Sequence, residues 1–256
     1  MERLERIAEV LDEAARARTA VPQLGVSGEE LTLAEAYAVQ AGVLRLREAR
    51  GERLVGVKMG FTSEAKRAQM NIDDLIFGRL TDAMRIESGG TLSLRHFIHP
   101  RAEPELAFLL RAPLRGRVSR ESARAAIASV APALEVVDSR YRDFRFSLAD
   151  VIADNSSSAA FVVGPWQSLP EDLRQLGIRL CFDGLPLETG SAAAIMGDPL
   201  LSLTAAARLA ADAGVTLEAG WLVMAGGATA ARPLKAGVRV SAEVESLGSA
   251  SFAVVP

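Results

Sequence analysis

Arg101-Ala-Glu-Pro-Glu-Leu-Ala-Phe-Leu-Leu110 decides the fold of this chain, together with Pro132-Ala-Leu-Glu-Val-Val137. Both stretches have the length and the apolar character of buried strands. Successive side chains of a strand alternate between its two faces, so we expect Glu103 and Glu105 to point the same way. The sequence therefore predicts a sheet whose apolar strands are interrupted by Glu103, Glu105 and Glu135.

Two interpretations of these glutamates stay open at this point. Desolvating a carboxylate costs several kcal/mol unless it is paired or bound to a metal. If the three carboxylates converge, a hard divalent cation such as Mg²⁺ or Mn²⁺ is the usual remedy for their repulsion. The alternative is that they lie at strand ends, solvated or paired with Arg101 and Arg140.

The composition is that of an ordinary globular chain, because 49% of the 256 residues are hydrophobic and 24% are charged. A net charge of −3 gives no reason to expect nucleic-acid or membrane binding. The single cysteine, Cys181, excludes an internal disulfide and predicts a buried, inert thiol. The charged start and the absence of a long apolar run predict no signal peptide, no membrane span and a cytoplasmic location.

The chain is expected to adopt an α+β fold, with a mixed or antiparallel sheet and helices at the N-terminus. Helices are predicted at 2–18, from Thr32 to near Gly51 with a Thr32/Glu35 capping box, at 119–130 and at 202–213. Strands are predicted at 54–59, 103–111, 132–138, 159–164, 177–182, 185–189, 221–225, 237–244 and 250–255, with Asp183-Gly184 as a hairpin turn. We divide the chain into an N-terminal helical segment, 1–80, and a catalytic domain, 81–256.

Lys58 lies in the short strand and is followed by the hydroxyl-rich turn Gly60-Phe-Thr-Ser63. A partly buried lysine can act as an electrostatic catalyst or a proton donor, whereas an edge-strand lysine would simply lie in solvent. Thr62 and Ser63 either cap a following short helix or help its N-terminus to bind a substrate carboxylate.

Several other polar segments give weaker indications. Asp154-Asn155 is expected to be an ordinary turn, after which the Ser157 hydroxyl could reach into a cleft. His96 and His99 lie in a segment expected to be extended, which does not favour a histidine metal site. Gly226-Gly227 lacks the lysine of a phosphate-binding loop, so the sequence gives little support for nucleotide binding.

Taken together, these segments resemble the hydratase/decarboxylase family of aromatic meta-cleavage pathways, which is related to the fumarylacetoacetate hydrolase fold. The resemblance covers nearly the whole chain in the family's order. It rests on five motifs: Gly56-Val-Lys-Met-Gly-Phe-Thr-Ser63, His99-Pro-Arg-Ala-Glu-Pro-Glu-Leu-Ala-Phe108, Leu134-Glu-Val-Val-Asp-Ser-Arg140, Ala153-Asp-Asn-Ser-Ser-Ser158 and Ala225-Gly-Gly-Ala-Thr229.

The resemblance implies that Glu103, Glu105 and Glu135 hold Mg²⁺ or Mn²⁺ and that the metal chelates a 2-oxo acid. It implies that Lys58 lies beside this substrate, and we predict that Lys58 serves chemistry more than stability. It also implies that the substrate contacts further residues, which we expect to be Thr62, Ser63, Ser157 and Gly226.

Two branches of the family compete for this chain. One hydrates 2-hydroxypenta-2,4-dienoate, and the other decarboxylates 2-oxohex-3-enedioate to that dienoate. The segment from Asp138 to Phe146 is similar to the decarboxylases, and Ile76 stands where hydratases tend to carry an aspartate that handles water. Leu75 departs from the proline common at its position.

The resemblance therefore implies decarboxylation, with hydration second and carbon–carbon hydrolysis third. From a different class of function, the chain could be a catalytically weak partner that stabilises a hydratase; its retention of Lys58 and the three glutamates argues against this. The expected partners are a small 2-oxo dicarboxylate, a pathway hydratase and further copies of the same chain.

Overall fold

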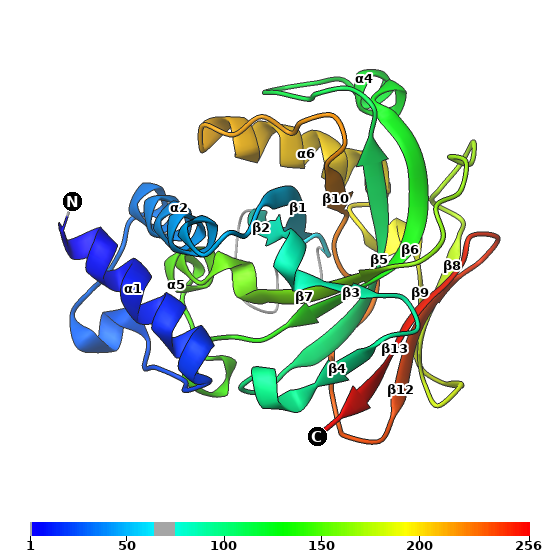
Figure 1. The fold of residues 1–256 in the computed structure, drawn as a ribbon. Helices are drawn as coiled ribbons and strands as arrows, with labels where there is room; N and C mark the ends of the chain where they lie inside the picture. The colour runs from blue at the N-terminus through cyan, green and yellow to red at the C-terminus, as the bar shows by residue number, and fades with distance from the viewer. Residues whose placement is uncertain (1, 64–74) are drawn as a thin grey trace.

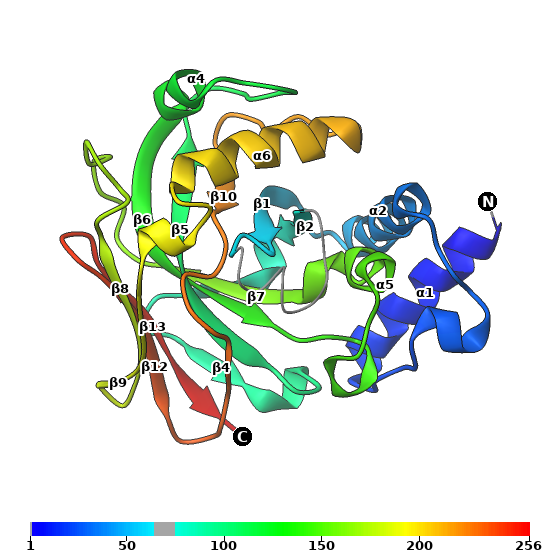
Figure 2. The same ribbon diagram turned by 180° about the vertical axis from the view of Figure 1, so that it is seen from behind.

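A computed structural model describes residues 2–63 and 75–256. Within these residues, two β-sheets form the centre of the molecule and helices lie around the larger one (Figure 1). Helices α1, α2 and α5 form a group at the opposite end from the smaller sheet, as both views show (Figure 2). The α+β fold with N-terminal helices is therefore confirmed.

The larger sheet is mixed and runs in the order β2-β1-β10-β5-β6-β7-β3, with β11 added to one end of β5. Its strands are β1 (Leu54–Gly60), β2 (Ile76–Thr81), β3 (Arg85–Glu87), β5 (Arg101–Leu110), β6 (Ile127–Val137), β7 (Ser158–Val163), β10 (Leu222–Met224) and β11 (Arg232–Pro233). Strand β10 comes late in the chain but lies between β1, to which it is parallel, and β5, to which it is antiparallel. The centre of the sheet thus joins three distant parts of the sequence.

The smaller sheet runs in the order β4-β13-β12-β8-β9. Its strands are β4 (Thr91–Ser93), β8 (Gly177–Phe182), β9 (Leu185–Ser191), β12 (Arg239–Val244) and β13 (Gly248–Val255). The predicted hairpin at Asp183-Gly184 is confirmed, since both residues adopt the positive φ that a tight turn needs. The two sheets share one buried cluster, in which Leu134 and Val136 of β6 pack with Phe252 of β13.

The helices are α1 (Glu2–Ala17), α2 (Leu33–Ala49), α4 (Arg120–Ala125), α5 (Leu148–Ala153) and α6 (Pro199–Asp212). Single 3₁₀ turns occupy Leu24–Ser27, Asp82–Met84, Leu94–His96, Arg142–Phe144, Asn155–Ser157 and Ala192–Ala194. No helix among the described residues has the length and apolar character to cross a membrane.

Two of the helix ends are fixed by the interactions that the sequence indicates. The Thr32 hydroxyl accepts from the Glu35 backbone N–H, and the Glu35 carboxylate accepts from the Thr32 backbone N–H, so the capping box is confirmed. Helix α6 ends at Asp212, shortly before Gly214, whose φ of 75° is left-handed.

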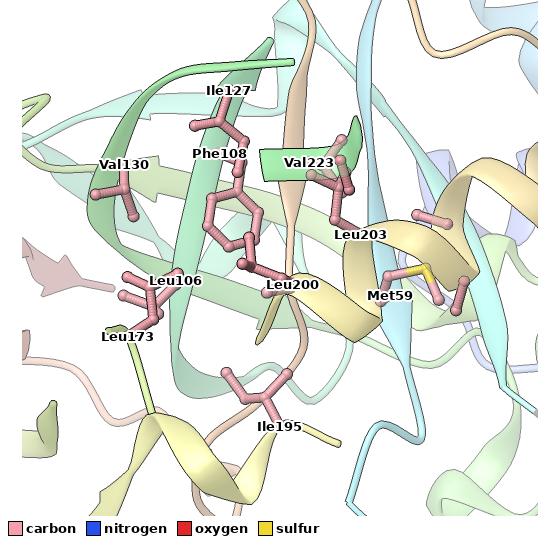
Figure 3. Packing of buried hydrophobic residues seen from close by; sticks show 14 of the residues in the cluster. Met59, Leu106, Phe108, Ile127, Val130, Leu173, Ile195, Leu200, Leu203 and Val223 are labelled. Atoms are coloured by element: carbon pink, nitrogen blue, oxygen red, sulfur yellow. The ribbon is translucent and has the colours of Figure 1, made fainter. Parts of the chain in front are cut away.

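The main core fills the space between the larger sheet and α6 (Figure 3). Leu106 and Phe108 point from one face of β5 toward Leu200 and Leu203 of α6. Each buried leucine or phenylalanine of this kind stabilises the fold by about 1.5–3 kcal/mol. Since side chains alternate, the opposite face of β5 carries the odd-numbered residues, including both glutamates.

The observed secondary structure differs from the prediction at several elements, and the short strands β3, β4 and β11 were not predicted. The helix predicted at 119–130 ends at Ala125, because the chain turns and Ile127 starts the long strand β6. Strand β2 was not predicted; its six residues are all buried, so they lack the alternation that marks a half-exposed strand. Helix α5, with only six residues, was also missed.

Two further predictions concern the segment from Thr62 to residue 80. The short helix expected after Thr62 and Ser63 falls outside the described residues. The domain division at residue 80 stays a prediction, although β1, which precedes it, and β2, which crosses it, belong to the same sheet as β5 and β6.

The close contact between β1 and β10 at Gly56 can be tested by substitution. A Cβ atom at Gly56 would lie 2.0 Å from the backbone oxygen of Leu222, and backbone cannot move aside without breaking the strand pair. We expect Gly56→Ala to lower the free energy of unfolding in urea by about 1–3 kcal/mol. Gly25→Ala is the control, because there a Cβ atom meets only the flexible Glu30 side chain at 3.7 Å. Equal stability of the two variants would contradict this prediction.

Candidate functional site

The register of β5 and β6 brings the three glutamates to one face of the larger sheet. Glu103 lies directly opposite Glu135, and Glu105 is two residues farther along β5, opposite Ala133. Residues opposite each other in an antiparallel pair point to the same side, and so do residues two apart in one strand. The predicted common face of Glu103 and Glu105 agrees with this register, and Glu135 joins it.

Lys58 reaches the same face from β1. It lies level with Met224 of β10, which lies level with Ala107 of β5. Its side chain is buried, and its Nζ atom lies 3.0 Å from Oε1 and 3.3 Å from Oε2 of Glu135. The alternative of an edge-strand lysine in solvent is therefore wrong, because β1 is flanked by both β2 and β10.

The protein interior makes the charged forms of these glutamates costly. Glu105 is 0% exposed and Glu135 is 1% exposed. Burial, reinforced by the charges of Glu135 and Glu103, raises the pKa of Glu105 well above its ordinary value. Burial also raises the pKa of Glu135, against the opposing effect of the Lys58 charge. The alternative that the glutamates are solvated at strand ends is wrong for these two.

Glu105 is held by the backbone of a late segment. Its Oε2 atom accepts a hydrogen bond of 2.8 Å from the Gly226 N–H, whereas its buried Oε1 atom has no hydrogen-bond partner in the described part of the chain. Gly226 has a φ of 105°, and a Cβ atom there would lie 2.2 Å from the Thr62 hydroxyl oxygen. Glycine at 226 is thus required for the contact among Glu105, Thr62 and this backbone.

Each of the two buried glutamates also has a partner from another segment of the chain. Glu135 faces Lys58, and Glu105 faces Gly226. Within residues 2–63 and 75–256, no three acidic, histidine or cysteine side chains converge as a metal-binding group. The three carboxylates nevertheless share one face of the sheet, and the charges of neighbouring glutamates contribute to the raised pKa of both Glu105 and Glu135.

A pocket opens over this face. Its polar wall consists of Lys58, Thr62, Arg101, Glu103, Glu135, Ser156 and Ser157. Its apolar wall includes Ile76, Val137, Phe144, Phe146, Val151 and Ala231. An apolar cleft with a few convergent polar groups is the usual form of a site for a small molecule.

The four residues predicted to contact substrate have different positions. Thr62 and Ser157 line the pocket. Gly226 lies beneath it, against Glu105 and Thr62, and its neighbour Gly227 reaches the wall. Ser63 is partly buried and is not part of the wall. Their roles in binding stay predictions.

An unusual backbone segment forms one side of the pocket. Asn155, Ser156 and Ser157 all have positive φ, at 50°, 54° and 57°, although none is glycine. A non-glycine residue in this backbone conformation costs on the order of 1–3 kcal/mol of folding free energy. The conformation persists only where contacts with the surrounding structure hold it. The Asn155 side chain accepts from the Arg79 N–H and donates to the Arg79 carbonyl, and the Ser156 hydroxyl donates to the Phe77 carbonyl. Strand β2 thereby holds the segment in place.

A second layer of buried polar groups supports β2 in turn. The Arg79 guanidinium donates to Oε1 of Gln40 at 2.8 Å, and Gln40 Nε2 donates to the carbonyls of Phe77 and Ile152. Burial lowers the pKa of Arg79 to about 10. Gln40 therefore links α2, β2 and α5 behind the pocket wall.

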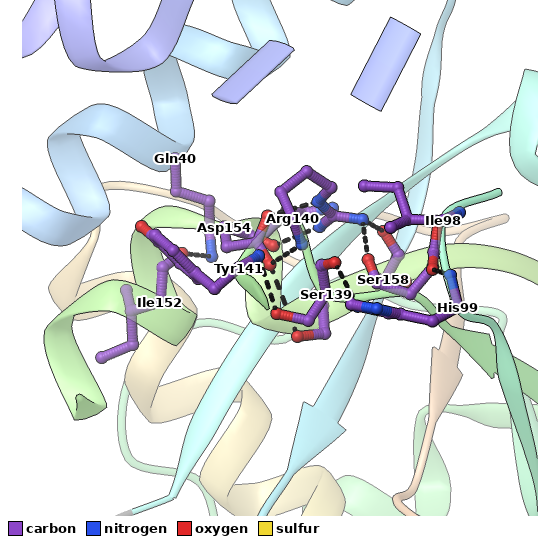
Figure 4. A network of polar contacts seen from close by, with 12 residues as sticks. Gln40, Ile98, His99, Ser139, Arg140, Tyr141, Ile152, Asp154 and Ser158 are labelled. Atoms are coloured by element: carbon purple, nitrogen blue, oxygen red, sulfur yellow. Dashed lines mark hydrogen bonds and ion pairs between the residues drawn. The ribbon is translucent and has the colours of Figure 1, made fainter. Parts of the chain in front are cut away.

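Arg140 forms a further buried network beside the pocket (Figure 4). Its guanidinium pairs with the Asp154 carboxylate and donates to the carbonyls of Asp138 and Asp154. The suggestion that Arg140 pairs with a site glutamate is therefore wrong. Asp154-Asn155 is also more than an ordinary turn, because Asp154 is buried and anchors Arg140.

The same network holds the start of β5. Asp138 accepts from the backbone N–H groups of Ile98 and His99, and His99 Nε2 lies 2.7 Å from the Ser139 carbonyl oxygen. The His99 ring packs against Phe144, with 4.6 Å between the ring centroids. His99 therefore helps to position an aromatic residue of the pocket wall.

Sequence reasoning missed the function of Arg101 and Phe144 in this wall. The Arg101 guanidinium carbon lies 4.2 Å from the centroid of the Phe144 ring. The sequence pattern indicated for Arg101 only a possible ion pair with a glutamate. Arg101 and Glu103 are two residues apart in β5, so their side chains lie on the same face. This spacing could have indicated that Arg101 belongs to the same site.

Comparison with known proteins assigns the family. The fumarylacetoacetate (FAA) hydrolase C-terminal family pattern matches residues 53–255. The chain belongs to this family. It is 52% identical to a 4-oxalocrotonate decarboxylase from Pseudomonas sp., over 98% of this chain and 97% of that protein.

A solved structure of the family has nearly the same fold. The 4-oxalocrotonate decarboxylase from Pseudomonas putida G7, complexed with magnesium and adipate, matches with a TM-score of 0.95 and 38% identity, over 99% of this chain and 98% of that chain. A hydratase is also similar: 2-hydroxyhexa-2,4-dienoate hydratase from Comamonas testosteroni is 36% identical over 94% of each chain. The family relation inferred from the sequence motifs is thus confirmed.

The buried Lys58–Glu135 pair revises the prediction that Lys58 serves chemistry more than stability. Removing one partner of a buried pair costs about 3–5 kcal/mol, since the other charge stays buried. We therefore expect Lys58→Met to lower the free energy of unfolding by this amount at pH 8. Without Lys58 the pKa of Glu135 rises further, so the folded state gains a proton as the pH falls and the loss should be smaller at pH 5.

A double variant separates the charge effect from packing. Lys58→Met/Glu135→Gln removes both charges and should be more stable at pH 8 than Lys58→Met alone. Urea unfolding of the single and double variants at both pH values measures the coupling. Wild-type stability of Lys58→Met at pH 8 would show that the ion pair contributes nothing to folding.

Proposed function

We propose that this protein decarboxylates 2-oxohex-3-enedioate (4-oxalocrotonate) to 2-hydroxypenta-2,4-dienoate and CO₂, with Mg²⁺ or Mn²⁺ as cofactor. The observation that carries the proposal is the 52% identity to a 4-oxalocrotonate decarboxylase over nearly the full length of both chains. The hydratase from Comamonas testosteroni is more distant, at 36%. The pocket lined by two glutamates and a buried lysine is the site at which we expect the substrate to bind and react.

The residues of the site fit a hard divalent cation. Glu103, Glu105 and Glu135 offer carboxylate oxygens, the donors that Mg²⁺ prefers. The buried Oε1 atom of Glu105 has no hydrogen-bond partner among the described residues, and such an atom is costly unless something binds it. We propose that these three glutamates hold the metal.

The reaction moves negative charge from one end of the substrate to the other. The C5–C6 bond breaks, CO₂ leaves, and the bonding electron pair moves through the C3=C4 alkene to the 2-oxo oxygen, which then takes a proton. The bound cation would supply Lewis-acid stabilisation of this oxygen. Lys58 places a second positive charge at the same wall of the pocket and can donate the proton.

The apolar wall favours decarboxylation over hydration. Ile76 is 2% exposed, lines the pocket and offers no group to activate water. Phe146 and Val151 line the same pocket and likewise offer no acid or base to activate water. Hydration of 2-hydroxypenta-2,4-dienoate is the second candidate, since the hydratase relative covers the same length of chain.

Other expectations stay predictions: the cytoplasmic location, the homo-oligomer and the complex with a pathway hydratase. The chemistry supports the last of these, because the dienoate product of decarboxylation is the substrate of hydration. A complex would pass that product between two sites.

Metal binding should be coupled to proton release. Because the pKa of Glu105 is raised, this carboxyl keeps its proton to a higher pH than an ordinary glutamate, and Mg²⁺ binding at Glu105 must displace that proton. We expect Mg²⁺ affinity to rise with pH, by up to about tenfold per pH unit while Glu105 is protonated. Calorimetry in buffers of different ionisation enthalpy would measure the released proton.

Two variants test this coupling. Glu105→Gln should weaken Mg²⁺ binding and remove the dependence on buffer ionisation, whereas the exposed control Glu218→Gln should change neither. Mg²⁺ affinity that is equal at pH 6 and pH 8 in the wild type would contradict the displacement of a proton.

A comparison of two substrates tests the proposed reaction. We expect the wild type with Mg²⁺ to decarboxylate 2-oxohex-3-enedioate with a kcat/KM at least on the order of 10²-fold above that for hydration of 2-hydroxypenta-2,4-dienoate, a barrier difference of about 2.7 kcal/mol. CO₂ release and dienoate absorbance measure the two rates. Exhaustive chelation should abolish CO₂ release, and faster hydration than decarboxylation would reverse the assignment.

A further inference from the structure

We propose that Arg101 binds the carboxylate at the far end of the substrate and so selects dicarboxylates over monocarboxylates. This inference rests on the proposed function, because it takes the three glutamates as the end of the pocket that binds the 2-oxo acid group. The evidence is the register of β5, the aromatic support of Arg101 and the charge balance of the pocket.

The register of β5 sets the backbone spacing between Arg101 and the first of the glutamates. Arg101 and Glu103 are two residues apart on one face, and their cross-strand partners are Val137 and Glu135. A two-residue step in an antiparallel strand is about 6.8 Å. This is close to the separation of the two carboxylates in an extended six-carbon diacid. A substrate with its 2-oxo group at the glutamates would therefore place its second carboxylate near Arg101.

The Arg101 guanidinium is held in place by an aromatic ring. It lies over Phe144, and the His99 ring contacts Phe144 in turn. His99 is itself fixed by Asp138 and by the Ser139 carbonyl. Stacking of this kind uses the face of the guanidinium and leaves its N–H donors at the edge, in the plane in which a carboxylate binds.

The charges near Arg101 leave it available to an anion. It lines the pocket and is only partly exposed. Among residues 2–63 and 75–256, no carboxylate forms an ion pair with Arg101, in contrast to Arg140, which pairs with Asp154, and Lys58, which pairs with Glu135. Arg101 thus contributes a positive charge to the part of the pocket wall that Phe144 forms.

The chemistry predicts a role in binding more than in the bond-breaking step. The distal carboxylate is charged in the bound substrate and becomes neutral CO₂, so the attraction to Arg101 weakens as the reaction proceeds. A contact that is stronger in the ground state than in the transition state lowers KM and does not raise kcat. Arg101 is therefore a specificity-determining residue.

Two unreactive 2-oxo acids test the proposal by binding alone. 2-Oxoadipate and 2-oxohexanoate share the 2-oxo acid group, but only 2-oxoadipate has the second carboxylate, and neither has the alkene that decarboxylation needs. With Mg²⁺ present, the wild type should bind 2-oxoadipate more tightly by on the order of tenfold to a hundredfold in calorimetry. Arg101→Met should bring this preference close to one and leave 2-oxohexanoate binding unchanged.

The variants are chosen so that loss of folding cannot imitate the result. Methionine can still pack on Phe144, and Arg101→Lys keeps the charge and should keep part of the preference. Arg145→Met is the matched control, because Arg145 directly follows Phe144 in the chain but is exposed and outside the pocket wall. It should keep the wild-type preference and thermal midpoint.

The outcomes distinguish this inference from the proposed function. A wild-type preference in Arg101→Met would overturn the role of Arg101, even if the enzyme releases CO₂ from 2-oxohex-3-enedioate. Failure of the wild type to bind either 2-oxo acid at millimolar concentration would also overturn it. If the preference is lost in Arg101→Met but the wild type releases no CO₂, the proposed reaction fails while the binding role of Arg101 stands.

Discussion

The site depends on one constraint, the placement of two buried carboxylates and a buried ammonium on one face of the larger sheet. Glu105 and Glu135 are buried, and Lys58 lies beside Glu135 at 3.0 Å. Such charges are tolerated only where opposite charges, hydrogen bonds or a cation meet them with good geometry. The register of β1, β10, β5 and β6 must therefore be held, because a shift by one residue would turn every one of these side chains to the opposite face.

The pocket walls depend on the same kind of buried polar contact. The left-handed segment Asn155–Ser157 is held by Arg79, and Arg79 is held by Gln40 of the distant helix α2. On the other side, Arg140 and Asp154 fix the chain that carries Phe144. These networks join the N-terminal helices to the sheet, so the helices act as part of the support for the pocket.

Periodicity and capping patterns predicted the elements whose signal is local. The Thr32 capping box, the Asp183-Gly184 hairpin and the common face of Glu103 and Glu105 all follow from residues a few positions apart. Strand β2 was missed because it is buried on both faces, and the burial of Lys58 was underestimated because β10 covers β1 from a distant part of the chain. The partners of Arg140 and Arg101 also depend on contacts that no local pattern contains.

The position of β10 has a consequence for the order in which the protein is made. Residues 222–224 lie between β1 and β5 in the finished sheet, yet they leave the ribosome well after both of those strands. Until they are inserted, β1, which carries Lys58, has no neighbouring strand on the side that β10 occupies. The Gly226 N–H also cannot reach Glu105. A chain that ends before residue 222 therefore lacks the strand that joins β1 to β5 and the backbone N–H that binds Glu105. The last third of the sequence thus completes a site whose charged side chains all come from the first two thirds.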